Sequence, residues 1–157
     1  SNHQMMNPYL YVFLISMLPF IELRGGIPYG IFSSLNPFLT FLLAIAGNML
    51  PVPFILLFLE DLEKYVRRWE KASKLLDWIF ERTYKKADKR VRRWEYFSLI
   101  LFVAVPLPGT GAWTGSLIAY LFKMNLRLSI LMIFVGVMIA GITVLVLSCY
   151  GFLYLLP

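Results

Sequence analysis

Glu22 and Arg24 are the residues of this sequence whose types and spacing best suit chemistry. They flank Leu23 and are the only charged side chains before Glu60. An ionisable group inside a membrane segment costs about 2.5–3.5 kcal/mol on insertion scales, so its presence there predicts a function. We expect Arg24 to bind an anion such as a phosphate and Glu22 to take up a coupling proton.

The sequence around these charges can complete the anion site with backbone donors. Gly25 and Gly26 follow Arg24, and a helix broken here offers free N–H groups and the positive end of its dipole. If the backbone is extended, Glu22 and Arg24 point to the same side. A second segment could donate to the same anion from the opposite side. It contains Pro108, Gly109, Thr110, Gly111, Trp113, Thr114 and Gly115. The alternative is that the two charges neutralise each other or cap broken helix ends.

The composition indicates that a membrane surrounds these residues. Hydrophobic residues make up 59% of the 157-residue chain, whose mean hydropathy is +0.70. Of the 24 charged residues, 20 lie between Glu60 and Glu95, and three stretches carry no charge, namely 25–59, 96–122 and 128–157. Each stretch exceeds the roughly 18–20 residues that cross a bilayer. The apolar run before Glu22 has neither a basic region nor a small-residue cleavage site, so we expect it to belong to the fold rather than to a signal peptide.

Several classes of site are excluded by composition. Cys149 is the only cysteine and His3 the only histidine, which excludes disulfides, zinc sites, haem ligation and Cys/His nucleophiles. We find no glycine-rich phosphate loop, metal-binding carboxylate cluster or serine-nucleophile motif. We therefore expect no enzyme activity, no cofactor and no metal.

Proline and glycine breaks divide the chain into a single all-α membrane domain. We expect a helical hairpin over 8–35, a span over 37–59 that Gly47–Asn48 and Pro51–Val52–Pro53 kink, a polar insert over 60–95, a second hairpin over 96–122 and a span over 128–157. The positive-inside rule requires Lys123 and Arg127 to lie on the same side of the membrane as the basic insert. They do so only if residues 96–122 form a re-entrant hairpin that returns to the side from which it entered. This places the insert in the cytoplasm and the protein in the cell membrane.

The two halves of the chain, 7–59 and 96–157, resemble each other. Leu23 and Gly25 are spaced like Leu107 and Gly109, and Asn36 and Gly47 are spaced like Asn125 and Gly136. Because each half crosses the membrane once, the two copies must be inserted upside-down relative to each other, as in many secondary transporters. So small a protomer is expected to form a homodimer.

The polar insert has the pattern of an amphipathic helix, broken near Thr83. One interpretation is that it lies on anionic lipid with interfacial aromatic and basic residues. These are Trp69, Trp78, Trp94, Arg67, Arg68, Arg92 and Arg93. A solvated connector or a coiled-coil contact in a dimer are the alternatives. Since charges of both signs are interleaved, we do not expect nucleic-acid binding.

Two motifs carry a resemblance to a known family. Residues 22–28 (ELRGGIP) and 106–115 (PLPGTGAWTG) resemble the signature motifs of the small multidrug export protein family of bacteria and archaea, and the likeness covers nearly the whole chain from Asn7. That family is similar, more remotely, to the DedA (SNARE-associated, VTT-domain) membrane proteins. This second resemblance implies paired re-entrant hairpins and transport of undecaprenyl phosphate or related lipids, coupled to protons or sodium. It places the acidic and arginine sites of those proteins on Glu22 and Arg24.

Three functions remain open at this point. The first is a transporter of an anionic lipid, lipid-linked phosphate or other small anion that is held by Arg24 and the hairpin turns. The second is a proton-coupled exporter of cationic drugs with Glu22 as the cation site, which the neighbouring Arg24 disfavours. The third is a membrane scaffold that transports nothing and recruits partners or anionic lipid through its basic helix.

Overall fold

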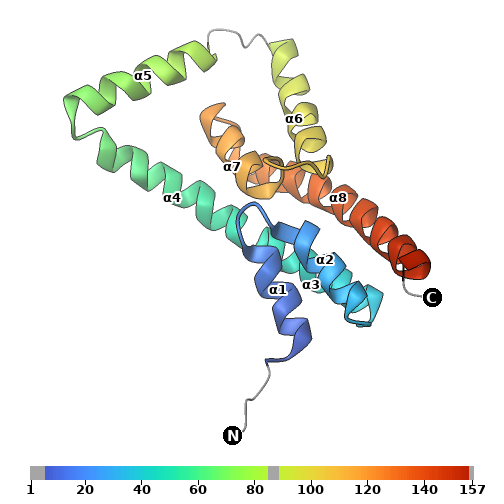
Figure 1. Ribbon diagram of the computed structural model, residues 1–157. Helices are drawn as coiled ribbons and strands as arrows, with labels where there is room; N and C mark the ends of the chain where they lie inside the picture. Colours follow the sequence, from blue (N-terminus) through green and yellow to red (C-terminus); the bar gives the residue numbers. More distant parts are fainter. Residues whose placement is uncertain (1–5, 85–88, 156–157) are drawn as a thin grey trace, which may run out of the picture.

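The computed structural model describes residues 6–84 and 89–155, and the regular elements in this part of the chain are all helices. The expected all-α class is confirmed (Figure 1). The helices are α1 (Pro8–Met17), α2 (Glu22–Phe32), α3 (Pro37–Met49), α4 (Pro51–Val66), α5 (Glu70–Tyr84), α6 (Lys89–Ala104), α7 (Ala112–Leu121) and α8 (Leu126–Leu155).

Within residues 6–84 and 89–155, two helical stretches are long and apolar enough to cross a membrane. They are α3 with α4, which together form the stretch Pro37–Val66, and α8, and each has 30 residues. Both lie where the sequence predicted a span, although the first continues beyond its expected end at residue 59. The amide of Leu50 still donates to the carbonyl oxygen of Ala46 at 3.0 Å, but the helical hydrogen bonding is interrupted after it because Pro51 and Pro53 lack an N–H. Leu50 itself keeps helical dihedrals, with φ −56° and ψ −43°.

Each span carries a pair of short helices. The chain breaks between α1 and α2 at Pro19 and between α6 and α7 at residues 105–111, as the sequence predicted. Helices α1 and α2 pack against α3, while α6 and α7 pack against α8. The halves also interlock, because α2 contacts α8 and α7 contacts α4.

The same hydrogen bond joins the first short helix to the span in both halves. The amide of Asn36 donates to Tyr9 Oη at 3.1 Å, and the amide of Asn125 donates to Tyr96 Oη at 3.1 Å. Both asparagines then cap the helix they precede, because their Oδ1 atoms accept from the amides two and three residues later.

Glycines give the same close approach in both halves. A Cβ atom on Gly47 would overlap the carbonyl oxygen of Phe13 in α1. A Cβ atom on Gly136 would lie 2.9 Å from the carbonyl oxygen of Ile100 in α6. Backbones that approach this closely need a glycine between them. The equal spacing of Asn36–Gly47 and Asn125–Gly136 therefore corresponds to a similar close contact between each span and the first short helix of its half.

The core lies where the short helices meet the two spans. Its most buried apolar side chains are Val12, Leu23, Ile27, Ala44, Val52, Leu99, Val103, Ala112, Ala119, Ile133 and Val137. Large apolar side chains also cover much of the outer surface, including Phe38, Phe54, Phe58, Leu147 and Leu153. An outer surface this rich in large apolar groups fits contact with lipid rather than water.

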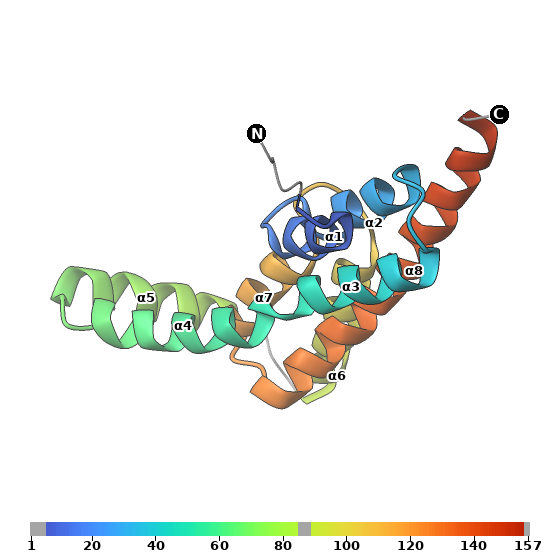
Figure 2. The same cartoon turned by 90° about the horizontal axis from the view of Figure 1, so that it is seen from below.

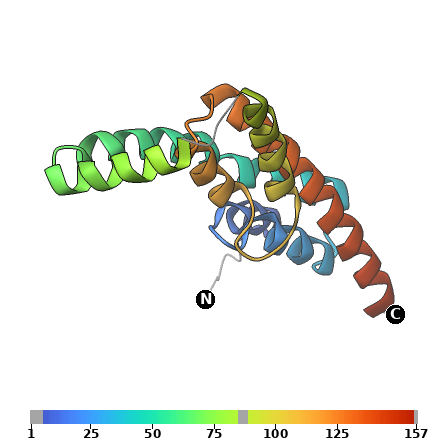
Figure 3. The same cartoon turned by 90° about the horizontal axis from the view of Figure 1, so that it is seen from above.

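The polar insert is not one amphipathic helix. The chain leaves the helix at residues 67–69, and α5 turns back at an angle from the end of α4 (Figure 1). Together, α5 and the end of α4 form an arm that projects from the other helices (Figures 2 and 3). The sequence analysis missed this turn, because no proline or glycine marks it. Helix α5 ends at Tyr84, close to the break expected near Thr83, and α6 begins at Lys89.

Candidate functional site

Glu22 lies at the start of α2 and caps a helix of the other half. Its carboxylate accepts hydrogen bonds from the amides of Ala112 and Trp113, both at 3.1 Å, and its side chain is buried. These amides are the first in α7, where unpaired N–H groups and the helix dipole favour an anion. The φ of Glu22 is 52°, an uncommon value for a residue other than glycine. Glu22 therefore caps a helix end, as the alternative interpretation of the sequence expected, and the capped helix is α7.

Arg24 binds the turn that precedes α7. Its guanidinium donates to the carbonyl oxygens of Leu107 and Thr110 and, at 3.1 Å, to Thr110 Oγ1. Thr110 Oγ1 also lies 2.7 Å from the carbonyl oxygen of Val105 and accepts from the amide of Leu107. Arg24 thus completes a turn that is organised around the Thr110 hydroxyl.

Glu22 and Arg24 reach different parts of the second hairpin because the backbone between them is helical. The expectation that an extended backbone places both side chains on one side is wrong. Helix α2 begins at Glu22, and residues two apart on a helix do not share a face. We call the contacts of these two residues with residues 107–113 the clasp.

Gly111 lies between the two charged side chains of the clasp. A Cβ atom on it would overlap Glu22 Oε2 and lie 2.7 Å from Arg24 Nη2. Its φ of 117° and ψ of −170° fall in a region that essentially only glycine adopts. Gly109 also has a positive φ, 81°, but a Cβ atom there would meet open space.

Two further side chains support the clasp. Asn48 Oδ1 accepts from the amide of Leu23 at 2.9 Å. Asn48 Nδ2 is buried without a hydrogen-bond partner among the described residues. Trp113 Nε1 donates to the carbonyl oxygen of Met17 at 3.0 Å, which ties α7 to the end of α1.

The other predicted site residues are placed apart from the clasp. A Cβ atom on Gly25 would overlap the side chain of Ile21 and crowd Ile15 of α1, and one on Gly26 would overlap the hydroxyl of Ser16 in α1. Gly115 faces α6 in the same way. Pro108 is exposed and Thr114 is half-buried. The sequence analysis missed Asn48 as a site residue, and its only signal was an amide within an apolar span.

A groove of about 340 Å³ opens beside Arg24. Its walls come from α2, from α8 and from the turn before α7. They consist of Pro28, Phe32, Pro106, Val144, Leu147 and Ser148. The groove therefore combines a cation with mainly apolar walls.

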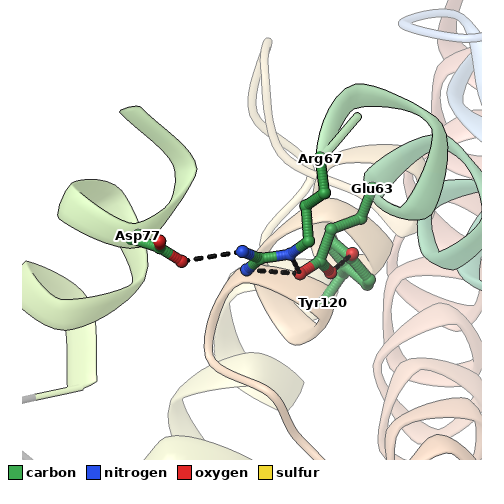
Figure 4. A network of polar contacts seen from close by, with 4 residues as sticks. All are labelled: Glu63, Arg67, Asp77 and Tyr120. Carbon is green, nitrogen blue, oxygen red and sulfur yellow. Dashed lines mark hydrogen bonds and ion pairs between the residues drawn. The ribbon is translucent and has the colours of Figure 1, made fainter. Parts of the chain in front are cut away.

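A second polar cluster joins α4, α5 and α7 (Figure 4). Tyr120 Oη donates to Glu63, whose carboxylate also accepts from Arg67 Nε at 2.8 Å, and Arg67 lies 2.7 Å from Asp77 of α5. Hydrogen bonds to Asp77 and Glu63 raise the pKa of Arg67 above its ordinary value. Arg67, one of the residues expected at the membrane interface, thus binds within the protein.

The remaining interface candidates point outward where their side chains are described. Trp69, Trp78 and Trp94 are exposed, and the guanidiniums of Arg68 and Arg82 lie over the rings of Tyr65 and Trp78, 5.8 and 4.9 Å from the ring centroids. Arg93 is also exposed. The Arg92 side chain lies outside the described part of the chain.

Comparison with protein families matches residues 22–143, more than half of the chain, to the family described as Putative small multi-drug export protein. The chain belongs to this family. No curated protein and no solved structure matches it. The matched region begins at Glu22, so it includes the whole clasp. Family membership and the two apolar helices identify a membrane protein of a transporter family. The remoter resemblance to DedA proteins stays a prediction.

Proposed function

We propose that this protein is a secondary transporter that moves an anionic lipid or lipid-linked phosphate across the membrane, and that the clasp is its closed gate. One observation carries the proposal. The Glu22 carboxylate occupies the N–H groups that open α7, while Arg24 binds the turn before them. This is an anion site filled by an anion of the protein itself.

The architecture that we propose is an inverted repeat of re-entrant hairpins. It is supported by the contacts that recur in both halves, from Tyr9 to Asn36 and from Tyr96 to Asn125. Helix α1, with ten residues, is about 15 Å long, half the thickness of the hydrocarbon core. A short helix that turns back at Pro19 would bring Glu22 to the interior of the membrane, with the insert on the cytoplasmic side.

The substrate in this proposal competes with Glu22. A phosphate head carries oxygens that accept the hydrogen bonds now made to the Glu22 carboxylate, and its charge is attracted by Arg24. The apolar groove beside Arg24 would hold the lipid chain against Phe32 and Leu147. Binding would thus replace one anion by another without leaving the α7 amides unpaired.

Coupling follows from the fate of the displaced carboxylate. Once a substrate accepts the hydrogen bonds of the first two α7 amides, the Glu22 carboxylate loses both backbone donors. It is then a charged group without hydrogen bonds from α7 in an apolar environment. Proton uptake would neutralise it, since an unpaired buried charge is more costly than a neutral group. A sodium ion is the alternative partner for the released carboxylate.

Export of cationic compounds is the second candidate, and the family description favours it. In that case Glu22 would be the cation site. Its carboxylate oxygens, however, already accept from Ala112 and Trp113, and the Arg24 charge acts on the same carboxylate. A cation would have to displace these donors while facing the Arg24 charge, so we favour an anion.

Flux in proteoliposomes tests the proposal. A fluorescent polyprenyl phosphate and a cationic dye such as ethidium are compared for the wild-type protein, Arg24→Ala and the exposed control Arg127→Ala. We expect flux of the lipid phosphate that is lost with Arg24→Ala and kept with Arg127→Ala. Dye flux without lipid flux would favour drug export. Absence of both would favour the scaffold.

A further inference from the structure

Helix α7 is held by a carboxylate at each end. Glu22 of the first half binds the amides of Ala112 and Trp113 at its start, and Glu63 of α4 accepts from the hydroxyl of Tyr120 near its end. The helix has ten residues, so about 15 Å separate its two ends. Glu22 belongs to the first half, and Glu63 lies where α4 extends from that half into the polar insert, whereas α7 belongs to the second half.

The contact at the far end of α7 is a built polar cluster. Glu63 is half-buried and accepts from Tyr120 and from Arg67, whose Nη1 lies 2.7 Å from Asp77. Figure 4 shows Arg67 lying between the carboxylates of α4 and α5. The cluster therefore couples the position of α7 to that of the projecting arm.

An aromatic contact closes this end further. Phe80 of α5 is 5% exposed and stands edge-on to the ring of Tyr120, with 6.1 Å between the ring centroids. The ammonium group of Lys123 lies 4.7 Å from the centroid of the Phe80 ring. The arm thus covers the Tyr120 contact with an apolar ring.

Open space lies beyond each end of α7, at the far end and beside the turn that precedes the helix, while one face of its middle is buried. A cavity of about 320 Å³ touches Glu60, Glu63, Tyr120 and Lys123 at the far end, and the groove of about 340 Å³ lies beside Arg24 at the other. Between them, Ser116 of α7 is fully buried. The buried face of α7 thus lies between the two spaces.

We infer that Glu63 and Tyr120 form a second gate of the transporter, at the end of α7 that faces the polar insert. The inference rests on the proposed function, in which the clasp is the first gate. With both contacts made, the structure is an occluded state, and alternating access requires the two contacts to open in turn. Glu63 and Tyr120 are positioning residues in this account, since they hold the far end of α7 in place and do not bind the substrate themselves.

Accessibility of a cysteine between the gates tests the inference. Ser116→Cys in a Cys149→Ser background is labelled with a water-soluble methanethiosulfonate added from the insert side of proteoliposomes. Loss of a hydrogen bond to a charged group opens the contact about tenfold more often. We therefore expect Tyr120→Phe to speed labelling about tenfold. Glu63→Gln should act in the same direction with a smaller effect, because its amide oxygen still accepts. Tyr65→Phe, which alters an exposed tyrosine of α4, should leave the rate unchanged.

A second cysteine separates gating from loosening of the whole protein. Ser16 of α1 is fully buried like Ser116, but it lies in the other hairpin. If Tyr120→Phe speeds labelling at Ser116→Cys and not at Ser16→Cys, the gate is supported. Equal acceleration at both positions, or none at either, overturns it. Labelling needs no substrate, so its result is independent of the flux experiment. The inference of a second gate can be overturned while lipid flux is observed, and it can be supported even if the substrate is not a lipid phosphate.

Discussion

The carboxylate of Glu22 accepts a hydrogen bond from the amide of Ala112, 90 residues further along the chain, at 3.1 Å. Each residue begins a helix, α2 and α7 respectively, so the two breaks in the apolar chain meet at this bond. A charge that is costly in an apolar interior is thereby stabilised by the amides of a helix N-terminus. The break in one half supplies the anion, and the break in the other supplies the donors.

Glu22→Gln should destabilise the protein. The carboxylate accepts from Ala112 and Trp113, and the glutamine would replace one of its oxygens by an NH₂ group that opposes an N–H donor. We expect a loss of about 2 kcal/mol in unfolding free energy, measured by denaturation in detergent. Glu60→Gln, at an exposed position, should stay within about 0.5 kcal/mol of the wild type. Equal effects of the two changes would contradict the clasp.

Gly111→Ala should be far more damaging than Gly109→Ala. Both glycines have a positive φ, but only at Gly111 would a Cβ atom meet Glu22 and Arg24. We expect Gly109→Ala to cost about 1 kcal/mol through backbone strain. Gly111→Ala should cost about 3 kcal/mol or more through strain and overlap. Unfolding of both variants in the same detergent compares them, and equal costs would show that the clasp does not fill the space at Gly111.

Arg24→Lys should fail to replace arginine even though it keeps the charge. The guanidinium reaches Leu107 and Thr110 at once, a forked contact that a lysine ammonium does not reproduce. We expect Arg24→Lys to lose about 1.5–3 kcal/mol of unfolding free energy, the range for hydrogen bonds to a charged group. Full stability of Arg24→Lys would mean that only the charge matters at this position.

Gly47→Ala and Gly136→Ala should destabilise the protein to a similar extent. A Cβ atom at either position would press on a carbonyl oxygen of the neighbouring short helix, at Phe13 and Ile100 respectively. We expect costs of about 1–3 kcal/mol for each, as for overpacked cores. Gly151→Ala is the matched control in α8, because its Cβ atom would meet only the ring of Phe32 at 3.8 Å. A large effect at one position alone would weaken the case for a structural repeat.

Much of the fold could be predicted because its signals are local. Apolar runs indicate the spans, and proline and glycine indicate the two breaks at Pro19 and at residues 106–111. The residue types at Glu22 and Arg24 also indicated a site. The local sequence could not show which groups would meet them, since that depends on how the hairpins pack. It also favoured a free anion pocket, whereas Glu22 itself fills the α7 amides.

The second polar cluster lay beyond sequence reasoning for the same reason. Glu63 and Tyr120 are 57 residues apart and lie in different predicted segments, one in the insert and one in a hairpin. Among many charged residues of the insert, Glu63 carries no local mark. The turn at residues 67–69 was missed because no proline or glycine marks it, and the contact between Arg67 and Asp77 across the turn joins residues ten positions apart.

Binding of a polyprenyl phosphate to the purified wild type, Glu22→Ala and Arg24→Ala tests the central claim most directly. If the substrate and Glu22 compete for the amides of α7, the two changes act in opposite directions. We predict that Glu22→Ala binds the lipid phosphate about tenfold more tightly than the wild type and that Arg24→Ala binds it about tenfold more weakly. Lipid affinity that is unchanged in both variants, together with a cationic dye that no longer binds to Glu22→Ala, would contradict the account.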